Sequence, residues 1–385
     1  MRRVLRFLLL KPVLWAAGKF SSKPNRQKIF DALSALYTHI LDTPDKEGPV
    51  IPFEQHSGKF IIFSDQHKGR RNGADDFIMA EPNYLAALDY YHKEGFCFIN
   101  LGDSEELWEN TLWQVRNKNK ATFEAEKKFV LDKKYVKVSG NHDLYWNTSP
   151  LAPLDLYAMY GSAIKIYDGV VLKTIIKKPG VVDLTNNDNG NIITPFSTDQ
   201  HTELSIFLTH GHQGDAQSDG NWFSKFFVGW IWAPLQALLR VNPNTPAYNN
   251  EKKTLHNSIM YEWSSAQKDL LLITGHTHQP VFASLTHIER LYKDFQFAEK
   301  EKNEKELTVL LDEIRKREKE FTAVSLDYMT MRPTYFNTGC CCFDDGDITG
   351  VEIADGGIRL IKWCLKDGKP WRQVLEEREF GDLVK

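Results

Sequence analysis

Residues of metal-ligating type occur in five short clusters along this sequence, and four of the clusters include a glycine. The clusters are Asp65-Gln66-His67, Gly102-Asp103, Gly140-Asn141-His142-Asp143, His210-Gly211-His212 and Gly275-His276-Thr277-His278. Carboxylate and amide oxygens together with imidazole nitrogens suit borderline divalent ions such as Mn²⁺, Fe²⁺ or Zn²⁺. Cysteine is missing from all five clusters, so they do not describe a closed structural zinc site. The expected chemistry is therefore that of a divalent metal centre.

Each cluster follows a short apolar run that has the length of a buried strand. The runs span residues 59–64, 96–101, 135–139, 204–209 and 270–274. Helices are predicted between the first three runs, at 82–93 and 123–131, which indicates a βαβαβ core. In open α/β sheets the active site lies at the carboxyl ends of the strands. The predicted strands would therefore bring the clusters together at one edge.

The rest of the chain divides around this core. We expect an N-terminal helical segment at 1–48, in which residues 29–41 carry apolar side chains at helical spacing, and one domain at 49–385. Residues 163–193 are strand-like, with a hairpin tip at 186–190. A helical insert is predicted at about 216–265, and a charged surface helix at 299–320. From residue 333 onward we predict short strands that form a second sheet and complete a sandwich.

The five clusters in this order resemble the calcineurin-like metallophosphoesterase superfamily. Its blocks DxH, GD, GNHD or GNHE, a later GH-containing cluster and GHxH all occur here, between residues 65 and 278. Asn337-Thr338-Gly339 also resembles the strand that follows GHxH in many members. The resemblance implies an α/β fold, namely a β-sandwich flanked by helices with a helical insert. It also implies a hydrolase that acts on phosphoester or diphosphate bonds.

The resemblance further assigns the metal ligands. It implies two divalent ions, with Mn²⁺ expected and Fe or Zn²⁺ as alternatives, and a metal-activated water that attacks phosphorus. Asp103 would bridge the two ions. The choice between His210 and His212 stays open, although the position directly at the end of the strand favours His210. The first ion would be held by Asp65, His67 and His278, and the second by Asn141, His210 and His276.

The same resemblance gives His142 a catalytic role without metal ligation. This histidine would protonate the leaving oxygen or stabilise charge on the phosphoryl group, and Asp143 would orient it. Lys68, Arg70 and Arg71 follow the first cluster and have two interpretations: contact with a phosphate or diphosphate, or solvation in a loop.

Two stretches resemble the wider UDP-2,3-diacylglucosamine diphosphatase-like group. They are Gly102–Trp108 and His210–Asp215, although that diphosphatase tends to carry Arg where this chain has His142, and its insert and tail are shorter. Residues 221–241 are rich in Trp, Phe and Leu, which indicates a helix that is buried, faces a membrane or folds over an apolar ligand. The basic, amphipathic residues 1–17 suit either contact with an anionic membrane surface or packing on the domain.

We therefore expect a phosphorylated small-molecule or lipid substrate, lipid-linked or a nucleotide diphosphate, with membrane contact through the N-terminus and 221–241. The alternatives are a general soluble phosphodiesterase or protein phosphatase, or a metal-bound interaction module without turnover. The net charge of −3 gives no basic field for nucleic acid, so no nucleic-acid partner is expected. The sequence does not identify the bond type, the native metal or the oligomeric state.

The five cysteines include three adjacent ones, Cys340, Cys341 and Cys342. Neighbouring cysteines rarely have the geometry of a structural disulfide, so we predict reduced thiols in a cytoplasmic protein, peripheral on the inner membrane if the N-terminus binds there. A Cys-rich metal site is the alternative, although the spacing is not that of a CxxC pair.

Overall fold

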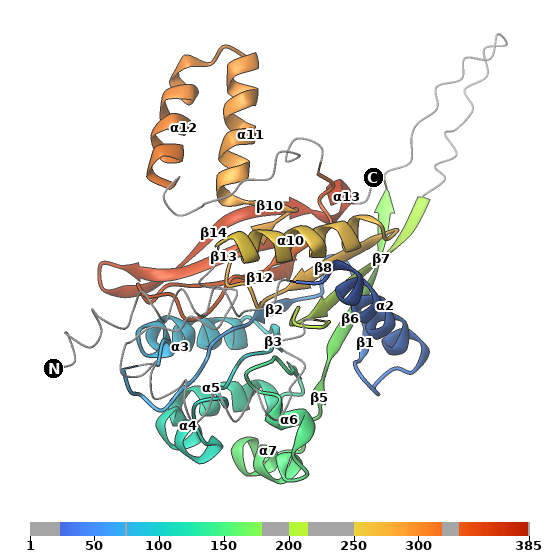
Figure 1. Ribbon diagram of the computed structural model, residues 1–385, viewed down its shortest axis with the longest axis vertical. Helices are drawn as coiled ribbons and strands as arrows, with labels where there is room; N and C mark the ends of the chain where they lie inside the picture. Colours follow the sequence, from blue (N-terminus) through green and yellow to red (C-terminus); the bar gives the residue numbers. More distant parts are fainter. Residues whose placement is uncertain (1–23, 74, 179–199, 215–249, 318–330, 384–385) are drawn as a thin grey trace.

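Two seven-stranded sheets form the centre of the protein, and helices lie over the outer face of each (Figure 1). The structure is a computed structural model that describes residues 24–73, 75–178, 200–214, 250–317 and 331–383. The two sheets pack through a shared apolar core to which both contribute buried side chains. This arrangement confirms the predicted α/β sandwich flanked by helices.

The first sheet has the strand order β14-β13-β12-β2-β3-β4-β5. Strands β2 to β5 are parallel to one another, and β12 joins the free edge of β2 in the antiparallel direction. The parallel part contains the first three predicted strands, so their carboxyl ends lie at one edge. The strands of this sheet are β2 (Phe60–Phe63), β3 (Cys97–Leu101), β4 (Tyr135–Val138), β5 (Ile166–Tyr167), β12 (Ile348–Ala354), β13 (Gly357–Lys366) and β14 (Lys369–Glu379).

Strand β2 shows how one short sequence serves two cores. All four of its residues are buried, and successive side chains of a strand point to opposite faces. Phe60 and Ile62 pack between the two sheets. Ile61 and Phe63 pack on the other face, with helix α3 (Phe77–Lys93). A continuous apolar run is therefore required here, because neither face meets water.

The second sheet has the strand order β1-β6-β7-β8-β11-β9-β10. Strands β7, β8 and β11 are parallel, so these three also end at a common edge. Helices α2 (Arg26–Asp42) and α10 (Asn250–Ser265) pack on the outer face of this sheet. The strands are β1 (Val50–Pro52), β6 (Gly169–Lys178), β7 (Gln200–Thr209), β8 (Leu270–Thr274), β9 (Val281–Phe282), β10 (Leu285–Thr286) and β11 (Tyr335–Asn337).

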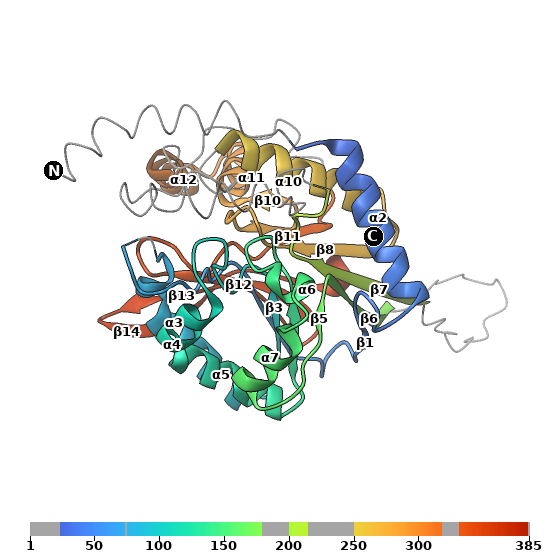
Figure 2. The ribbon, with the colours of Figure 1, turned by 60° about the horizontal axis from the view of Figure 1, so that its bottom comes forward.

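The remaining helices surround the first sheet or extend from the sandwich. Figure 2 shows the strands between one group of helices that contains α3, α4, α5 and α7 and another that contains α2 and α10. Helices α11 and α12 form a hairpin that projects away from both sheets (Figure 1). None of the helices within the described residues has the length and apolar character needed to span a bilayer. The bounds are α4 (Leu112–Lys118), α5 (Lys120–Leu131), α6 (Tyr145–Thr148), α7 (Ala152–Tyr160), α11 (His287–Lys300), α12 (Glu304–Arg317) and α13 (Phe380–Leu383).

Three expectations from the sequence differ from the structure. The strands after residue 333 do not form a second sheet by themselves: β12 to β14 extend the first sheet, because the parallel crossovers leave β2 with an unpaired edge, and β11 enters the other sheet. The charged helix predicted at 299–320 is the separate helix α12, and the chain turns between Glu301 and Asn303. Helix α3 begins at Phe77, before Pro82, which lies inside it.

Several predicted segments lie outside the described residues. They are most of the N-terminal segment 1–48, the hairpin tip at 186–190 and the greater part of the insert at 216–265, including 221–241. The division of the chain at residue 48 and the limits of the insert stay predictions. Helix α2 accounts for the amphipathic stretch 29–41, with Ile29, Leu33, Leu36 and Ile40 buried.

Candidate metal centre

The five clusters meet at one edge of the sandwich, where strands of both sheets end. Asp65 and His67 follow β2, Asp103 follows β3, and His142 follows β4. The other sheet supplies His210 after β7, and His276 and His278 after β8. The two sheets therefore contribute ligands from opposite sides of the shared core, which explains why residues more than 200 positions apart come into contact.

The first donor group consists of Asp65, His67 and His278. Asp65 Oδ1 lies 3.1 Å from His278 Nε2, and the Nε2 atoms of His67 and His278 are 3.2 Å apart. The ligand atoms of all three residues lie within 4.8 Å of one another. Asp65 Oδ2 faces away from this group, because it accepts a hydrogen bond of 3.0 Å from the backbone of His276.

The second donor group consists of Asp103, His210 and His276, and it adjoins the first. Asp103 Oδ2 lies 3.1 Å from His210 Nε2 and 3.8 Å from His67 Nε2, so one carboxylate oxygen faces both groups. The rings of His210 and His276 are 5.3 Å apart. Within the described residues His212 belongs to neither group, and its ring lies 5.4 Å from that of His210 and 6.5 Å from that of His276.

Hydrogen bonds to the far side of the rings determine which nitrogen faces each group. His210 Nδ1 donates to the carbonyl oxygen of Leu101 at 2.8 Å, so Nε2 is the ring nitrogen on the side of Asp103 and is the one that a metal ion could take in place of a proton. His67 Nδ1 donates to Glu106 Oε2 at 3.1 Å, so its Nε2 is likewise the nitrogen that faces the first donor group. Histidines that bind metals characteristically donate their second ring N–H in this way.

Several of the donor atoms of the predicted ligands lack hydrogen-bond partners within the described residues. Four buried atoms of the predicted ligands have no hydrogen-bond partner in the described part of the chain: Asp65 Oδ1, Asn141 Oδ1, His210 Nε2 and His276 Nε2. Buried polar groups without partners are costly, and most such groups in folded proteins are paired. Carboxylate oxygens, amide oxygens and imidazole nitrogens are the ligand types that borderline divalent cations prefer. Because these atoms are distributed over two adjoining donor groups, the residues present fit two such ions.

The pKa values of the predicted ligands are shifted by the close approach of carboxylates and imidazoles. Burial raises the pKa of Asp65, but His278 and His210 outweigh it and hold that pKa well below its usual range. Asp103 behaves alike, because His210 and His142 lower its pKa more than burial raises it. Burial lowers the pKa of His210 and His278, but their carboxylate neighbours raise both to about 9. Protons and metal ions therefore compete for these two rings.

Five of the predicted ligands have left-handed backbone conformations. The φ angles are 53° at Asp65, 48° at His67, 50° at Asp103, 69° at His276 and 56° at His278. For residues other than glycine, this backbone conformation costs about 1–3 kcal/mol of folding free energy each, and such residues concentrate at functional sites. The surrounding strands must hold these turns in place.

Gly140 shows how closely the backbone approaches the centre. A Cβ atom at this position would lie 2.1 Å from Asp103 Oδ1 and 2.3 Å from the Asp103 nitrogen. Only glycine fits there without displacing the carboxylate that faces both donor groups. The glycine of the third cluster is therefore a requirement of packing.

His142 lies beside the first donor group and is held by Glu106. Its Nδ1 donates to Glu106 Oε2 at 2.7 Å, and its ring stacks on Trp108 with centroids 4.5 Å apart and planes inclined by 14°. The expectation that Asp143 orients this ring is wrong. The Asp143 carboxylate instead accepts from the backbone amides of Gly140 at 2.6 Å and Ser104 at 2.9 Å, so it fixes the turn that carries His142.

Glu106 is the functional residue that sequence analysis missed. One carboxylate oxygen accepts from both His67 and His142, which connects a predicted ligand to the predicted catalytic histidine. Burial raises the pKa of Glu106, but the two histidines outweigh this effect and lower it to about 2, so the group is a carboxylate. The only sequence signal was an acidic residue three positions after Asp103.

We predict that Glu106→Gln lowers metal affinity or turnover by about 10–100-fold while the fold is retained. The reason is that the neutral amide oxygen is a weaker acceptor than a carboxylate oxygen for the two ring N–H groups, and the amide nitrogen in place of Oε1 cannot accept from the backbone N–H of Trp108. Metal titration and steady-state kinetics measure the effect. Glu124→Gln, an exposed glutamate on α5, is the control, and equal behaviour of the two variants would contradict the assignment.

The basic residues after the first cluster do not form a phosphate site as a group. Lys68 is fully buried, with Nζ 2.6 Å from Glu126 Oε1 and 3.2 Å from Glu105 Oε1, so it is neither a phosphate ligand nor a solvated loop residue. Arg71 forms an ion pair with Glu81. Arg70 is exposed.

Comparisons with known proteins find similar chains among solved structures, at low sequence identity. No protein-family model and no curated protein sequence matches the chain. A Vacuolar Protein Sorting 29 structure from Cryptosporidium parvum shares 12% identity at a TM-score of 0.31, over 84% of this chain and 99% of that one. A Vps29 single mutant from Entamoeba histolytica gives 13% and 0.28 with the same coverage. A dimetal phosphatase from Danio rerio gives 10% and 0.31, over 83% of this chain and 100% of that one. TM-scores this low do not establish common descent or activity, so a function must be argued from the site itself.

Proposed function

We propose that the protein is a hydrolase of phosphoester or diphosphate bonds that uses two divalent metal ions. The observation that carries this proposal is the position of Asp103 Oδ2, which lies 3.1 Å from one histidine of the second donor group and 3.8 Å from one of the first. One carboxylate between two sets of neutral and anionic donors is suited to bridging a pair of ions. Asp65, His67 and His278 would hold one ion, and Asn141, His210 and His276 the other.

Two bound ions would supply Lewis acidity toward phosphoryl oxygens and would activate water as a nucleophile at neutral pH. The chain itself contributes His142. Because Glu106 engages Nδ1, the Nε2 atom is the nitrogen left to give a proton to the leaving oxygen. Trp108 covers one face of the ring and restricts its rotation. Glu106 also stabilises the positive charge of the ring whenever it is protonated.

The substrate class is the finer part of the proposal. We favour a lipid-linked phosphate or a nucleotide diphosphate, on the strength of the resemblance of Gly102–Trp108 and His210–Asp215 to the diacylglucosamine diphosphatase-like group. The apolar composition of 221–241 and the basic, amphipathic N-terminus support an amphipathic substrate at a membrane surface. Those two segments lie outside the described residues, so this support comes from composition alone.

The proposal is tested by turnover of bis-p-nitrophenyl phosphate and p-nitrophenyl phosphate by the purified chain with Mn²⁺. We expect activity that a chelator removes and that added Mn²⁺ restores, together with two bound ions per chain. The ratio of diester to monoester turnover would then narrow the substrate class. Failure to bind any divalent ion would refute the proposal, whereas binding without turnover would point to a metal-bound interaction module.

A further inference from the structure

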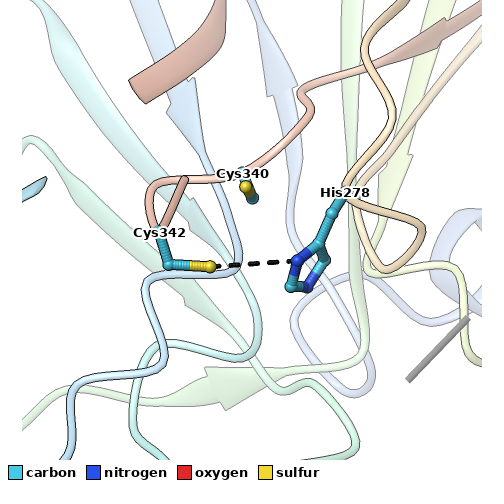
Figure 3. A group of neighbouring side chains, drawn as sticks. All are labelled: His278, Cys340 and Cys342. Atoms are coloured by element: carbon cyan, nitrogen blue, oxygen red, sulfur yellow. Dashed lines mark hydrogen bonds between the residues drawn. The ribbon is translucent and has the colours of Figure 1, made fainter. Parts of the chain in front are cut away.

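Two cysteines adjoin the proposed centre at His278 and are not among its ligands. Strand β11 is parallel to β8 and ends at the same edge, and the loop after it carries Cys340, Cys341 and Cys342. The sulfur atoms of Cys340 and Cys342 and one ring nitrogen of His278 lie within 4.8 Å of one another. Figure 3 shows the Cys342 side chain directed at the His278 ring, with Cys340 beside them.

The three adjacent cysteines separate into two sets. Cys340 and Cys342 face His278, whereas Cys341 packs in the core beneath α3, and its sulfur lies 3.8 Å from the carbonyl oxygen of Thr349. The loop bends at Cys341, and the first and third cysteines lie on the side of His278. This pairing was not visible as a CxxC pattern.

His278 lies between the first donor group and the two cysteines, and a different ring nitrogen faces each of them. Its Nε2 lies 3.1 Å from Asp65 Oδ1, on the side of the first donor group. Its Nδ1 lies 3.8 Å from the Cys342 sulfur. In a tetrahedral zinc site with the usual bond lengths, sulfur and nitrogen ligands are separated by about 3.5–3.8 Å. The observed separation is therefore close to that of a metal-bound pair.

We propose that Cys340, Cys342 and His278 Nδ1 form a third site, for a thiophilic metal ion such as Zn²⁺, that shares His278 with the first donor group. Two sulfur ligands with an imidazole select soft or borderline ions over Mn²⁺ or Mg²⁺, which prefer oxygen. His278 also lines a cavity of about 660 Å³, together with Gln279 and Lys253, and through this cavity an ion would approach the site. The site would carry three protein ligands and a fourth position open to this cavity.

The shared ring connects this site to the proposed function. An ion on Nδ1 takes the position that would otherwise hold a hydrogen, so the ring would become an imidazolate between two metals. Occupancy of the third site would then change how His278 holds the first ion of the pair. The thiol site itself requires only the two cysteines and one histidine, and so can be tested independently of catalysis.

The experiment measures Co²⁺ and Zn²⁺ binding to the metal-free full chain under reducing conditions. We expect three Zn²⁺ per chain, a near-ultraviolet sulfur-to-cobalt charge-transfer band with Co²⁺, and protection of two of the five thiols from alkylation by Zn²⁺. Cys340→Ser and Cys342→Ser should each lose the band and one equivalent of metal. Cys341→Ser is the matched control and should keep both, with circular dichroism confirming that each variant is folded.

Asp103→Ala separates this inference from the proposed function. It should lose the pair of ions and keep the sulfur charge-transfer band, because Asp103 is not part of the thiol site. Loss of the band in Asp103→Ala, or an unchanged metal content in the cysteine variants, would each overturn the third site.

Discussion

Asp103→Ala is expected to remove both ions of the proposed pair and to reduce turnover to the background rate. The carboxylate is the single group that faces both donor sets, and it also accepts a hydrogen bond of 2.8 Å from the backbone of His142. Loss of Lewis acidity toward the phosphoryl group costs several kcal/mol in the transition state. This loss corresponds to a decrease in kcat/KM of at least about 10³-fold.

Metal analysis after dialysis and steady-state kinetics on the p-nitrophenyl esters measure the effect of this substitution. Asp132→Ala removes an exposed carboxylate at the end of α5, remote from the site, and should leave both quantities unchanged. Asp103→Asn is a second variant that keeps the size of the side chain and an acceptor for the His142 amide. If Asp103→Ala bound two ions as tightly as the parent chain, the bridging role would be wrong.

The largest expected effect on stability belongs to Lys68, which lies immediately after the first cluster. Its ammonium group is fully buried between Glu105 and Glu126, and Lys137 contacts Glu105 at 2.9 and 3.0 Å, so two lysines neutralise two glutamates. Tyr84 and Tyr160 donate to Glu126 at 3.0 and 2.7 Å. Lys68→Met would leave two buried carboxylates with one cation.

We therefore predict that Lys68→Met lowers the free energy of unfolding by about 3–5 kcal/mol, because an uncompensated buried charge costs that much. Chemical denaturation followed by circular dichroism measures the change. Lys93→Met removes a lysine from an exposed ion pair with Asp89 on α3 and should have little effect. The double variant Lys68→Met/Glu126→Gln restores neutrality and should recover part of the loss, whereas no recovery would indicate that packing, not charge, explains the loss.

The sequence was most informative where chemistry and strand ends coincide. Short apolar runs followed by ligand-type residues predicted β2, β3, β4, β7 and β8, because strands buried on both faces must be apolar throughout. The structure places six of the seven predicted ligands in two adjoining groups at one edge, with His210 beside Asp103 and His276. What made this possible is local: each cluster is contiguous with its strand.

The features that escaped prediction depend on contacts between distant segments. Glu106 was not distinguished from the other acidic residues, because its partners His67 and His142 come from two different loops. Lys68 is flanked by polar residues typical of a solvated loop, and its burial depends on Glu126, 58 positions away. The sequence also could not predict which sheet β12 to β14 would join. An antiparallel set of strands can pair with the free edge of either sheet, and the sequence does not show which edge is free.

The five predicted ligands with left-handed backbone conformations serve the proposed activity at a cost in folding stability. Glycine at Asp65, His67, Asp103, His276 or His278 would relieve backbone strain while deleting a ligand. Under relaxed selection for chemistry, such replacements would be favoured by thermodynamics instead of merely tolerated. The metal ligands would then be lost through substitutions that stabilise the fold. A screen that selects for thermal stability alone would therefore select such substitutions among the first.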